Sequence, residues 1–178
     1  GNTMAKGDGA EERKKRTITE IRGSKTTGEK MVYMSVPDYT SAQWAEMAGV
    51  DVAVVGDSLA MIAHGHPNTI PATMDMMVLH SQAVRRGAPN TFVLGCMPYQ
   101  SYHAVEVALA NATRFMQDSG SDAVKPQGGK SQAHILKALV DAGIPNDRFK
   151  LIPGFYDQSL TEELKDELQK PKVAFVNI

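Results

Sequence analysis

The side chains in this sequence that are best suited to chemistry follow directly after short apolar runs. In chain order they are Asp38, Asp57, Ser58, Cys96, Lys125 and Gln127. Carboxylates, a hydroxyl and an ammonium could together bind a small 2-oxo acid, with Lys125 facing its carboxylate and a divalent cation polarising its carbonyl. The sequence therefore predicts an oxo-acid site if folding brings these side chains to one edge.

Each of these residues also has a structural alternative. Asp57 or Ser58 could cap the following helix, which is a common role of Asp and Ser at turns. Lys125 and Asp57 could pair with each other and take no part in chemistry. Cys96 could act as a nucleophile if a neighbouring base activated its thiol, but no such partner is visible, so we expect a small buried residue.

The histidines offer a second possible site. His64 and His66 lie two residues apart in a loop with Gly65 and Pro67, and could be metal ligands or a solvated pair. No third ligand is obvious nearby, which favours the solvated pair. The remaining histidines fall in helical stretches, and we expect surface or packing roles for them: His80, His103 and His134.

The elements that must position these residues alternate between strand-like and helix-like segments from Lys30 onward. We expect strands at 31–36, 52–55, 91–94, 122–125, 149–152 and 173–178. We expect helices at 41–47, where Ser41 caps, and at 73–86, 104–117, 131–142 and 161–169. Regular alternation with short connections predicts a parallel sheet, whose carboxyl ends form one rim.

The expected fold is α/β, with a mainly parallel sheet of about six βα units. Six strands are too few for a closed eight-stranded barrel of about 250 residues. We therefore expect either an incomplete (βα)8-type barrel or an open doubly wound Rossmann-like sheet. Exposed sheet edges promote pairing between chains, which predicts a homo-oligomer.

The composition excludes several classes of partner. Charged residues make up 22% of the chain and the formal net charge is -1, so there is no electrostatic reason to expect nucleic acid or an anionic membrane. A single cysteine excludes an internal disulfide and fits a reducing cytoplasm. No apolar run approaches ~18 residues, so we expect no membrane span.

The N-terminus is set apart by its composition. Residues 1–16 lack the apolar centre of a signal peptide and contain the basic run RKKR at 13–16. We expect a flexible lead-in, with the basic run as a solvated arm rather than a binding patch. Residues 17–178 are expected to form a single α/β domain.

Four motifs carry a family resemblance. They are PDYTSA at 37–42, VGDSLAM at 55–61, HSQAVRRGAPN at 80–90 and VKPQGG at 124–129. In this combination and order, residues 17–145 resemble ketopantoate hydroxymethyltransferase, a member of the phosphoenolpyruvate/pyruvate group of (βα)8 barrels. The resemblance implies transfer of a one-carbon unit from methylenetetrahydrofolate to 3-methyl-2-oxobutanoate, with magnesium holding the oxo acid while its enolate forms.

The resemblance also implies roles for individual residues. Asp57 would be a magnesium ligand, Ser58 a substrate contact and Lys125 a contact of the substrate carboxylate. Cys96 and Gln127 stand where the family has acidic residues near the metal. Since magnesium prefers oxygen ligands and needs their charge, the loss of two carboxylates predicts weak magnesium binding and impaired catalysis.

The last part of the chain resembles a different family more weakly. Residues 146–178, with PGFY at 153–156, are similar to a class I macrocin-type O-methyltransferase segment. The tripeptide at 143–145 is plausible in both families, which predicts a recombination point there. Residues 17–145 would then be barrel-type βα units, and 146–178 a Rossmann-type βαβ continuation.

Three functional hypotheses follow from these patterns. The first is a chimeric or truncated ketopantoate hydroxymethyltransferase-like scaffold with a remnant oxo-acid and magnesium site and little or no turnover. The second is an active, divergent magnesium-dependent hydroxymethyltransferase or lyase, which would need ligands from a partner chain. The third is a non-catalytic module that binds an oxo acid or another anion.

Overall fold

A parallel sheet forms the centre of the molecule in the computed structural model, which describes residues 13–128, 130–145 and 175–176. The strand order is β4-β3-β2-β1-β5. The strands are β1 (Tyr33–Ser35), β2 (Val52–Val55), β3 (Phe92–Cys96), β4 (Ala123–Lys125) and β5 (Phe175–Val176). All four pairings between neighbours are parallel, which confirms the expected α/β class.

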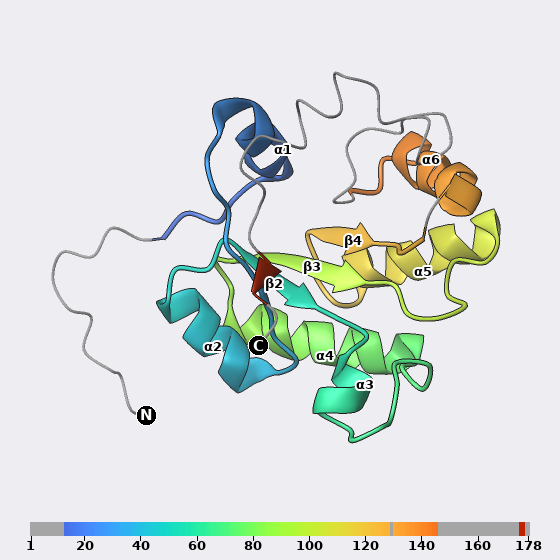
Figure 1. Cartoon of the computed structure of the whole chain (residues 1–178), viewed down its shortest axis with the longest axis horizontal. Helices are drawn as coiled ribbons and strands as arrows, with labels where there is room; N and C mark the ends of the chain where they lie inside the picture. The colour runs from blue at the N-terminus through green and yellow to red at the C-terminus, as the bar shows by residue number, and fades with distance from the viewer. Residues whose placement is uncertain (1–12, 129, 146–174, 177–178) are drawn as a thin grey trace, which may run out of the picture.

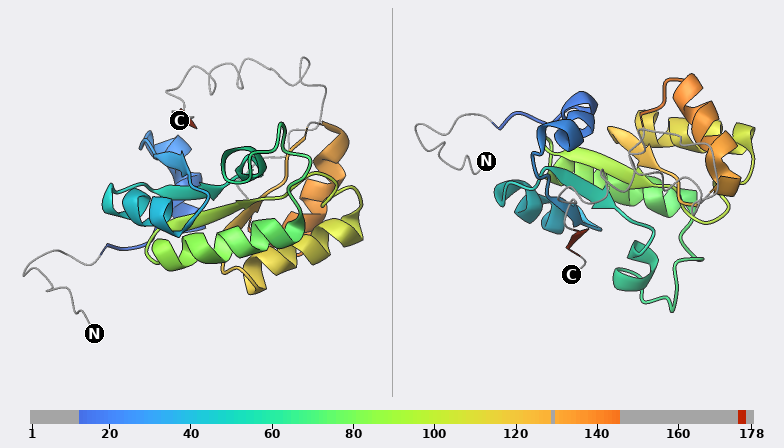
Figure 2. Two further views of the ribbon diagram at one scale, coloured as in Figure 1. Left: turned by 90° about the horizontal axis from the view of Figure 1, so that it is seen from below. Right: turned by 45° about the horizontal axis from the view of Figure 1, so that its top comes forward.

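Helices cover one face of this sheet in chain order. They are α2 (Tyr39–Met47), α4 (Met74–Gly87), α5 (Val105–Gln117) and, after the 3-10 turn η1 (Lys130–Gln132), α6 (Ala133–Asp141). The short α3 (Leu59–Ile62) lies instead beyond the carboxyl end of β2 (Figure 1). Figure 2 shows α4 and α5 side by side along the sheet, and their apolar residues share a core with the outward-facing strand residues. Successive crossovers on one face are the winding of a (βα)8 barrel, so the described residues follow the barrel alternative and not the doubly wound one.

The opposite face of the sheet is covered by α1 (Ile18–Thr27). Ile21 of this helix packs in a second core against Val52, Phe92, Leu94 and Ala123. All five residues of β3 are buried, as is required of a strand covered on both faces. Near the amino ends of β2, β3 and β4 the sheet is therefore packed on both faces.

Local sequence explains where the helices begin. Thr17 and Glu20 form a capping box at the start of α1, and Gly28 ends that helix with a φ of 75°. Asp38 caps α2, with its carboxylate accepting from the backbone N–H of Ser41 at 2.8 Å. The expectation that Ser41 itself caps this helix is wrong, because Ser41 occupies the third helical position and completes the box.

The expected strands at 31–36, 52–55, 91–94 and 122–125 are confirmed with small shifts at their ends, and β5 confirms part of the strand expected at 173–178. The strand expected at 149–152 and the helix at 161–169 lie outside the described residues. Neither α1 nor α3 was expected from the sequence. No helix in the described part of the chain is long and apolar enough to cross a membrane.

The basic run at 13–16 is docked on the fold through Arg13 and Arg16, whereas Lys14 and Lys15 are exposed, as expected of a solvated arm. Arg13 donates to the backbone carbonyls of Glu46 and Val50. Arg16 pairs with Asp51 at 3.0 Å and with Glu29, and its pKa is raised chiefly by the Asp51 hydrogen bond. These contacts tie the start of the described chain to the amino end of the sheet, whereas residues 1–12 lie outside the described part.

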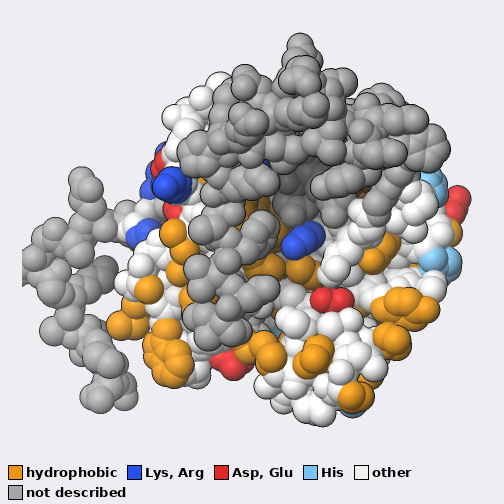
Figure 3. Space-filling view, in the orientation of Figure 1, with side chains coloured by type: hydrophobic (Ala, Val, Ile, Leu, Met, Phe, Trp, Pro, Cys, Tyr) orange, Lys and Arg blue, Asp and Glu red, His pale blue; other side chains and the backbone are white. Residues whose placement is uncertain are grey.

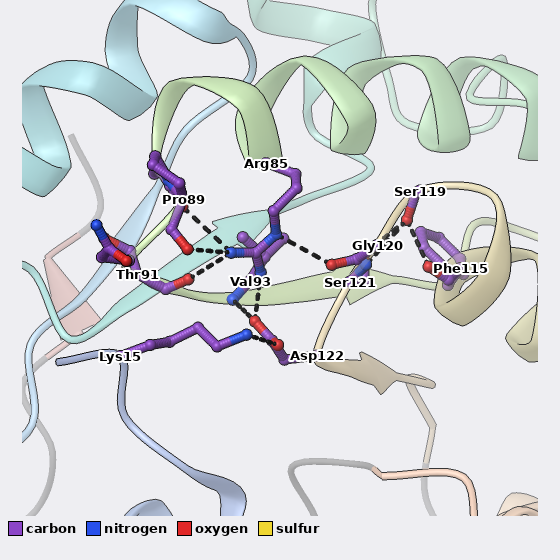
Figure 4. Close-up of polar contacts among 12 residues, drawn as sticks. Lys15, Arg85, Pro89, Thr91, Val93, Phe115, Ser119, Gly120, Ser121 and Asp122 are labelled. Carbon is purple, nitrogen blue, oxygen red and sulfur yellow. Dashed lines mark hydrogen bonds and ion pairs between the residues drawn. The ribbon is translucent and has the colours of Figure 1, made fainter.

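A polar cluster holds the amino ends of β3 and β4 together. Arg85 reaches from α4 and pairs with Asp122, whose carboxylate also accepts from the backbone N–H of Val93 and pairs with Lys15 (Figure 4). The Arg85 guanidinium donates in addition to the carbonyls of Gly120, Ala88, Pro89 and Thr91. This cluster lies at the end of the strands away from the rim, where a structural role is expected.

Candidate functional site

The candidate site lies at the carboxyl ends of the strands, where β2, β3 and β4 point toward one edge (Figure 1). Cys96 and Lys125 are register partners at the ends of β3 and β4. Register partners in a sheet project from the same face, so the thiol and the ammonium start from the same side of the sheet. The rim expected from the sequence is therefore formed by the fold.

The turn after β2 brings two hydroxyls together. A Cβ atom at Gly56 would lie 3.0 Å from the Ser58 Oγ and 3.6 Å from the Ser35 Oγ. Both hydroxyls therefore border the same side of this turn, and the absence of a side chain at Gly56 leaves them their space. Ser35 was not among the residues expected at the rim, although its place at the end of the first strand, before Pro37 and Asp38, was a signal for it.

Asp57 contacts a residue from the far side of the described rim. The Gln127 Nε2 donates to the Asp57 Oδ1 at 3.4 Å, which is long for a hydrogen bond. Asp57 is half-buried and Gln127 is exposed. The fold thus joins two predicted site residues, one after β2 and the other after β4.

The capping alternative is wrong for this turn. Ser58 is the N-cap residue of α3 but makes no side-chain capping hydrogen bond, and the Asp57 carboxylate accepts from Gln127. Asp38 behaves in the opposite way, because its carboxylate is held by the N–H and hydroxyl of Ser41. Of the two carboxylates expected at the rim, Asp57 is therefore the one turned to it.

Cys96 is buried, with 3% of its surface exposed, as expected for a small core residue. The backbone N–H of the following Met97 donates to the Lys125 carbonyl at 3.0 Å, which fixes the two strand ends side by side. Lys125 is half-buried. An ammonium at the mouth of this core is well placed to meet the carboxylate of a small acid.

His64 and His66 are both exposed, as expected of a solvated pair, but His64 also contacts His80, which was not expected. The His64 Nε2 lies 2.9 Å from the Nε2 of His80, which projects from α4, while His66 takes no part in this contact. In the described ranges no group of three or more His, Cys, Asp or Glu side chains could hold a metal ion. The metal-ligand interpretation of His64 and His66 therefore has no support in the fold.

The donors at the rim do not fit a strong magnesium site. They comprise the Asp57 carboxylate, the Ser58 hydroxyl, the Gln127 amide and the Cys96 thiol. Magnesium takes hard oxygen ligands with near-octahedral geometry, and carboxylates supply the charge that holds it. A thiol is a soft ligand and an amide is neutral, so these donors should bind a hard dication such as magnesium with low affinity.

Comparison with known proteins places this rim in a family. A family model described as ketopantoate hydroxymethyltransferase matches residues 15–146. The 3-methyl-2-oxobutanoate hydroxymethyltransferase 1 of Methylibium petroleiphilum is 83% identical over 134 residues, which are 75% of this chain and 46% of that protein. A Thermus thermophilus protein described as 3-methyl-2-oxobutanoate hydroxymethyltransferase is 44% identical over 131 residues, or 74% of this chain and 49% of that one.

The chain spans about half the length of the curated relatives it matches. The family match ends at residue 146, next to the boundary that the sequence predicted at 145. The methyltransferase resemblance falls on residues 146–178, of which the structure describes 175 and 176, so that resemblance stays a prediction.

Solved structures agree on the fold. A 2,3-dimethylmalate lyase, a PEP mutase/isocitrate lyase superfamily member, matches with a TM-score of 0.55 and 19% identity over 70% of this chain and 47% of that one. An oxaloacetate acetylhydrolase matches with a TM-score of 0.56 and 11% identity over 85% and 61%. At these low identities the TM-scores show a shared fold and no more. The family model and the 83% identical relative show that the chain shares an ancestor with the family. The chain belongs to the ketopantoate hydroxymethyltransferase family.

Proposed function

We propose that this chain is a ketopantoate hydroxymethyltransferase-like scaffold that binds 3-methyl-2-oxobutanoate or a related 2-oxo acid and turns it over slowly or not at all. The substrate class follows from the activity for which the relatives are named. The observation that carries the proposal is the hydrogen bond from the Gln127 amide to Asp57, with a buried thiol at Cys96. A metal-dependent transferase would need further carboxylates there.

Binding of the acid would use the groups that the rim still has. The Lys125 ammonium would pair with the carboxylate of the oxo acid, and the Ser58 hydroxyl would donate to one of its oxygens. A charge-assisted hydrogen bond is roughly twice as strong as a neutral one, so Lys125 should contribute most of the affinity. Asp57, which bears the same charge as the acid, should keep the acid toward β4.

Slow turnover has a physical reason. Forming an enolate from the oxo acid develops negative charge on its carbonyl oxygen, and a catalyst has to stabilise that charge as it appears. Lys125 would already be occupied by the substrate carboxylate, and the remaining donors hold magnesium weakly. Methylenetetrahydrofolate would be a co-substrate if turnover occurs. We place this activity in the cytoplasm, as the single free cysteine suggests.

Calorimetry with 3-methyl-2-oxobutanoate, in the presence and absence of magnesium, tests this proposal. We expect binding without magnesium and less than about a threefold change when magnesium is added. Lys125→Met should weaken binding roughly 10- to 100-fold, since it removes a hydrogen bond between charged groups. Lys137→Met is the matched control, because Lys137 pairs with Asp141 on the surface of α6 and should leave binding unchanged.

The same measurement distinguishes the alternatives. Binding that depends strongly on magnesium would contradict the proposal and support an active enzyme with ligands from a partner chain. No detectable binding under either condition would exclude an oxo-acid site in this chain. A separate NMR measurement in deuterated water completes the test: tight binding of the acid without exchange of its C3 proton would favour the pure binding module over slow catalysis.

A further inference from the structure

The contact between His64 and His80 joins two separate elements of the chain. His80 projects from α4, and His64 lies in the segment between α3 and α4, residues 63–72, here named the α3–α4 loop. Their Nε2 atoms are 2.9 Å apart and their rings are nearly perpendicular, at 78°. The ring centroids are 5.1 Å apart, so each nitrogen projects toward the other ring. This is the geometry of a linear hydrogen bond and not of two nitrogens converging on a metal.

The other nitrogen of His80 fixes which atom carries the proton. The His80 Nδ1 lies within hydrogen-bond distance of the Pro37 carbonyl oxygen, which can accept but not donate. Nδ1 therefore holds the hydrogen, and in the neutral ring the Nε2 of His80 is an acceptor. The His64 Nε2 must then be the donor, so one proton occupies the space between the two rings.

A second proton in that space would break the contact. If both imidazoles are charged, each Nε2 carries a hydrogen, and two donors with like charge face each other across 2.9 Å. An imidazole ordinarily changes charge between about pH 5 and 8, so acid favours the doubly protonated state. The contact forms while His80 is neutral and is lost when both rings are protonated.

The α3–α4 loop is anchored in the core at its last residue, Ala72, which is 3% exposed, but its first part has little else that ties it to the rest of the fold. Residues 61–68 are exposed. Within the described residues, the other hydrogen bonds of the loop run to α3 or stay inside the loop, as in His66 N–H to the Ala60 carbonyl at 2.9 Å and Ala72 N–H to the Thr69 carbonyl at 3.0 Å. Segments with few buried contacts open at low cost in free energy. The histidine pair is thus the polar link from this loop to α4 and to the β1–α2 connection.

The charged groups on the neighbouring elements are already engaged. At the start of α2 the Asp38 carboxylate accepts from Ser41, and further along α2 the Glu46 carboxylate accepts from Asn90 and Thr91. On α4 Asp75 pairs with Arg114, and before α3 Asp57 accepts from Gln127. His66 is the other titratable group in the loop. In the part of the chain that the structure describes, no carboxylate pairs with either ring, so a charge gained by the pair has no partner to hold it.

We propose that His64 and His80 form a proton-controlled latch that holds the α3–α4 loop on α4 at neutral pH and releases it in acid. The loop follows directly after Asp57, Ser58 and α3, so its release loosens one side of the rim. The latch depends on the two imidazoles and the Pro37 carbonyl, and it operates whether or not the rim binds an oxo acid.

Amide hydrogen exchange of residues 63–72, corrected for the intrinsic dependence of exchange on pH, tests the latch. From about pH 8 to 5.5 we expect exchange to rise roughly three- to tenfold, the range set by the loss of a single hydrogen bond. His64→Ala should exchange fast at both pH values and lose the pH dependence. His66→Ala, in the same loop but outside the contact, should keep it.

Nitrogen NMR of the imidazoles provides the second readout. At pH 8 we expect His80 to carry its proton on Nδ1 and His64 on Nε2. The latch would be overturned if both rings gain protons while exchange of the loop stays constant, or if His66→Ala removes the pH dependence as His64→Ala does. The opposite tautomer of His80 at pH 8 would overturn it as well. Both substitutions are at exposed positions, so the fold should tolerate them.

Discussion

At the scale of single residues, the main feature of the rim is that an amide and a thiol, from Gln127 and Cys96, lie where charged carboxylates would hold a cation. The Gln127 amide donates to Asp57, where a carboxylate would instead repel it unless a cation lay between them. Cys96 contributes a thiol that is 3% exposed and sits beside Lys125 in the register of the sheet. Neither Gln127 nor Cys96 carries a negative charge that a bound cation would have to neutralise. A single substitution at each position would restore a carboxylate.

We therefore expect the double variant Cys96→Asp, Gln127→Glu to gain magnesium binding. Three carboxylates at one rim repel one another, so this variant should be less stable than the parent without metal and should recover with magnesium. Thermal unfolding with and without magnesium measures this. The matched control is Cys96→Asn with Gln127 retained, which has the shape of Asp at position 96 without its charge. A magnesium response equal to that of the parent would refute the expectation.

A second prediction at this scale concerns Glu20. The backbone N–H of Thr17 donates to its carboxylate at 2.7 Å and the Thr17 hydroxyl at 2.8 Å, and these bonds lower the pKa of Glu20 below its ordinary value. A carboxyl group whose pKa is lowered in the folded state stabilises the fold at pH values above its ordinary, unfolded-state pKa. This stabilisation is lost as the pH falls through the lowered, folded-state pKa. The start of α1 should therefore fray in acid.

Carboxyl NMR of Glu20 checks this directly. Thr17→Ala removes the hydroxyl donor but keeps the backbone N–H, so the pKa of Glu20 should rise part of the way toward its ordinary value. Thr27→Ala, at the other end of α1, should leave the titration of Glu20 unchanged. An unaltered titration in Thr17→Ala would show that the hydroxyl makes no difference to the carboxylate.

At the scale of elements, α2 and α4 pack closely because α4 ends in glycine. A Cβ atom at Gly87 would lie 2.4 Å from the Tyr39 carbonyl oxygen and 3.0 Å from the Ala42 Cβ. Since the first obstacle is backbone, it cannot move aside as a side chain could. Gly87→Ala should lower the free energy of unfolding by about 1–3 kcal/mol through overpacking.

Gly23 is the matched control for this substitution. It also lies in a helix, but a Cβ there would meet nothing within 4 Å. Gly23→Ala should be neutral or stabilise by up to about 1 kcal/mol, because alanine has the higher helix propensity. Urea denaturation of both variants measures the difference, and equal stabilities would contradict the packing argument.

Arg85 links α4 to the amino ends of β3 and β4. Its guanidinium serves Asp122 and four backbone carbonyls around β3 and β4. Arg85→Ala leaves Asp122 half-buried with less compensation and should cost roughly 2–4 kcal/mol. Arg86→Ala, the exposed neighbour, should change the midpoint of unfolding little. A similar loss in both variants would exclude a special role for the cluster in Figure 4.

The strands could be predicted from the sequence because buried parallel strands are short apolar runs bounded by turns. Ala53 and Val55, for example, are fully buried in β2. α1 was missed, although the Thr17 and Glu20 capping box marked its start, because its hydrophobic face is narrow and buries Ile21 and little else that is apolar. Its place is fixed by tertiary packing under the sheet, which a local pattern does not contain.

The positions of the candidate site residues could be predicted from the sequence, but their contacts could not. Asp57, Ser58 and Lys125 were expected at strand ends, and parallel strands bring such ends together whatever their sequence. The bond from Gln127 to Asp57 and the pairing of His64 with His80 depend on how two loops lie across the rim. Such contacts follow from side-chain reach in three dimensions, so spacing along the chain did not reveal them.

At the scale of the whole molecule, hydrophobic side chains gather over α2 and α3 on the face in Figure 3. Trp44 is 66% exposed and Met47 is 84% exposed on α2, and Ile62 of α3 is 63% exposed. Trp and Met are enriched in protein interfaces, and the one acidic residue of α2, Glu46, is turned inward to Asn90 and Thr91. Exposed apolar side chains of this kind can be buried against the same side chains of a second copy.

The homo-oligomer expected from the sequence therefore remains our prediction for the chain in solution. Light scattering over a range of concentrations should give a mass above that of one chain, and Trp44→Glu with Met47→Glu should shift it toward the monomer. Leu79→Glu, exposed on α4, serves as the control for added charge. A monomer at every concentration would refute the prediction.

The pairing of β5 with β1 affects how the chain folds during its synthesis on the ribosome. Tyr33 is synthesised long before Phe175, its register partner, and at ribosomal speeds the delay is on the order of ten seconds. For that time the outer edge of β1 offers its backbone donors and acceptors to any other extended chain. A nascent chain is therefore most prone to mispairing at β1, and slower translation of its last third should lengthen this period.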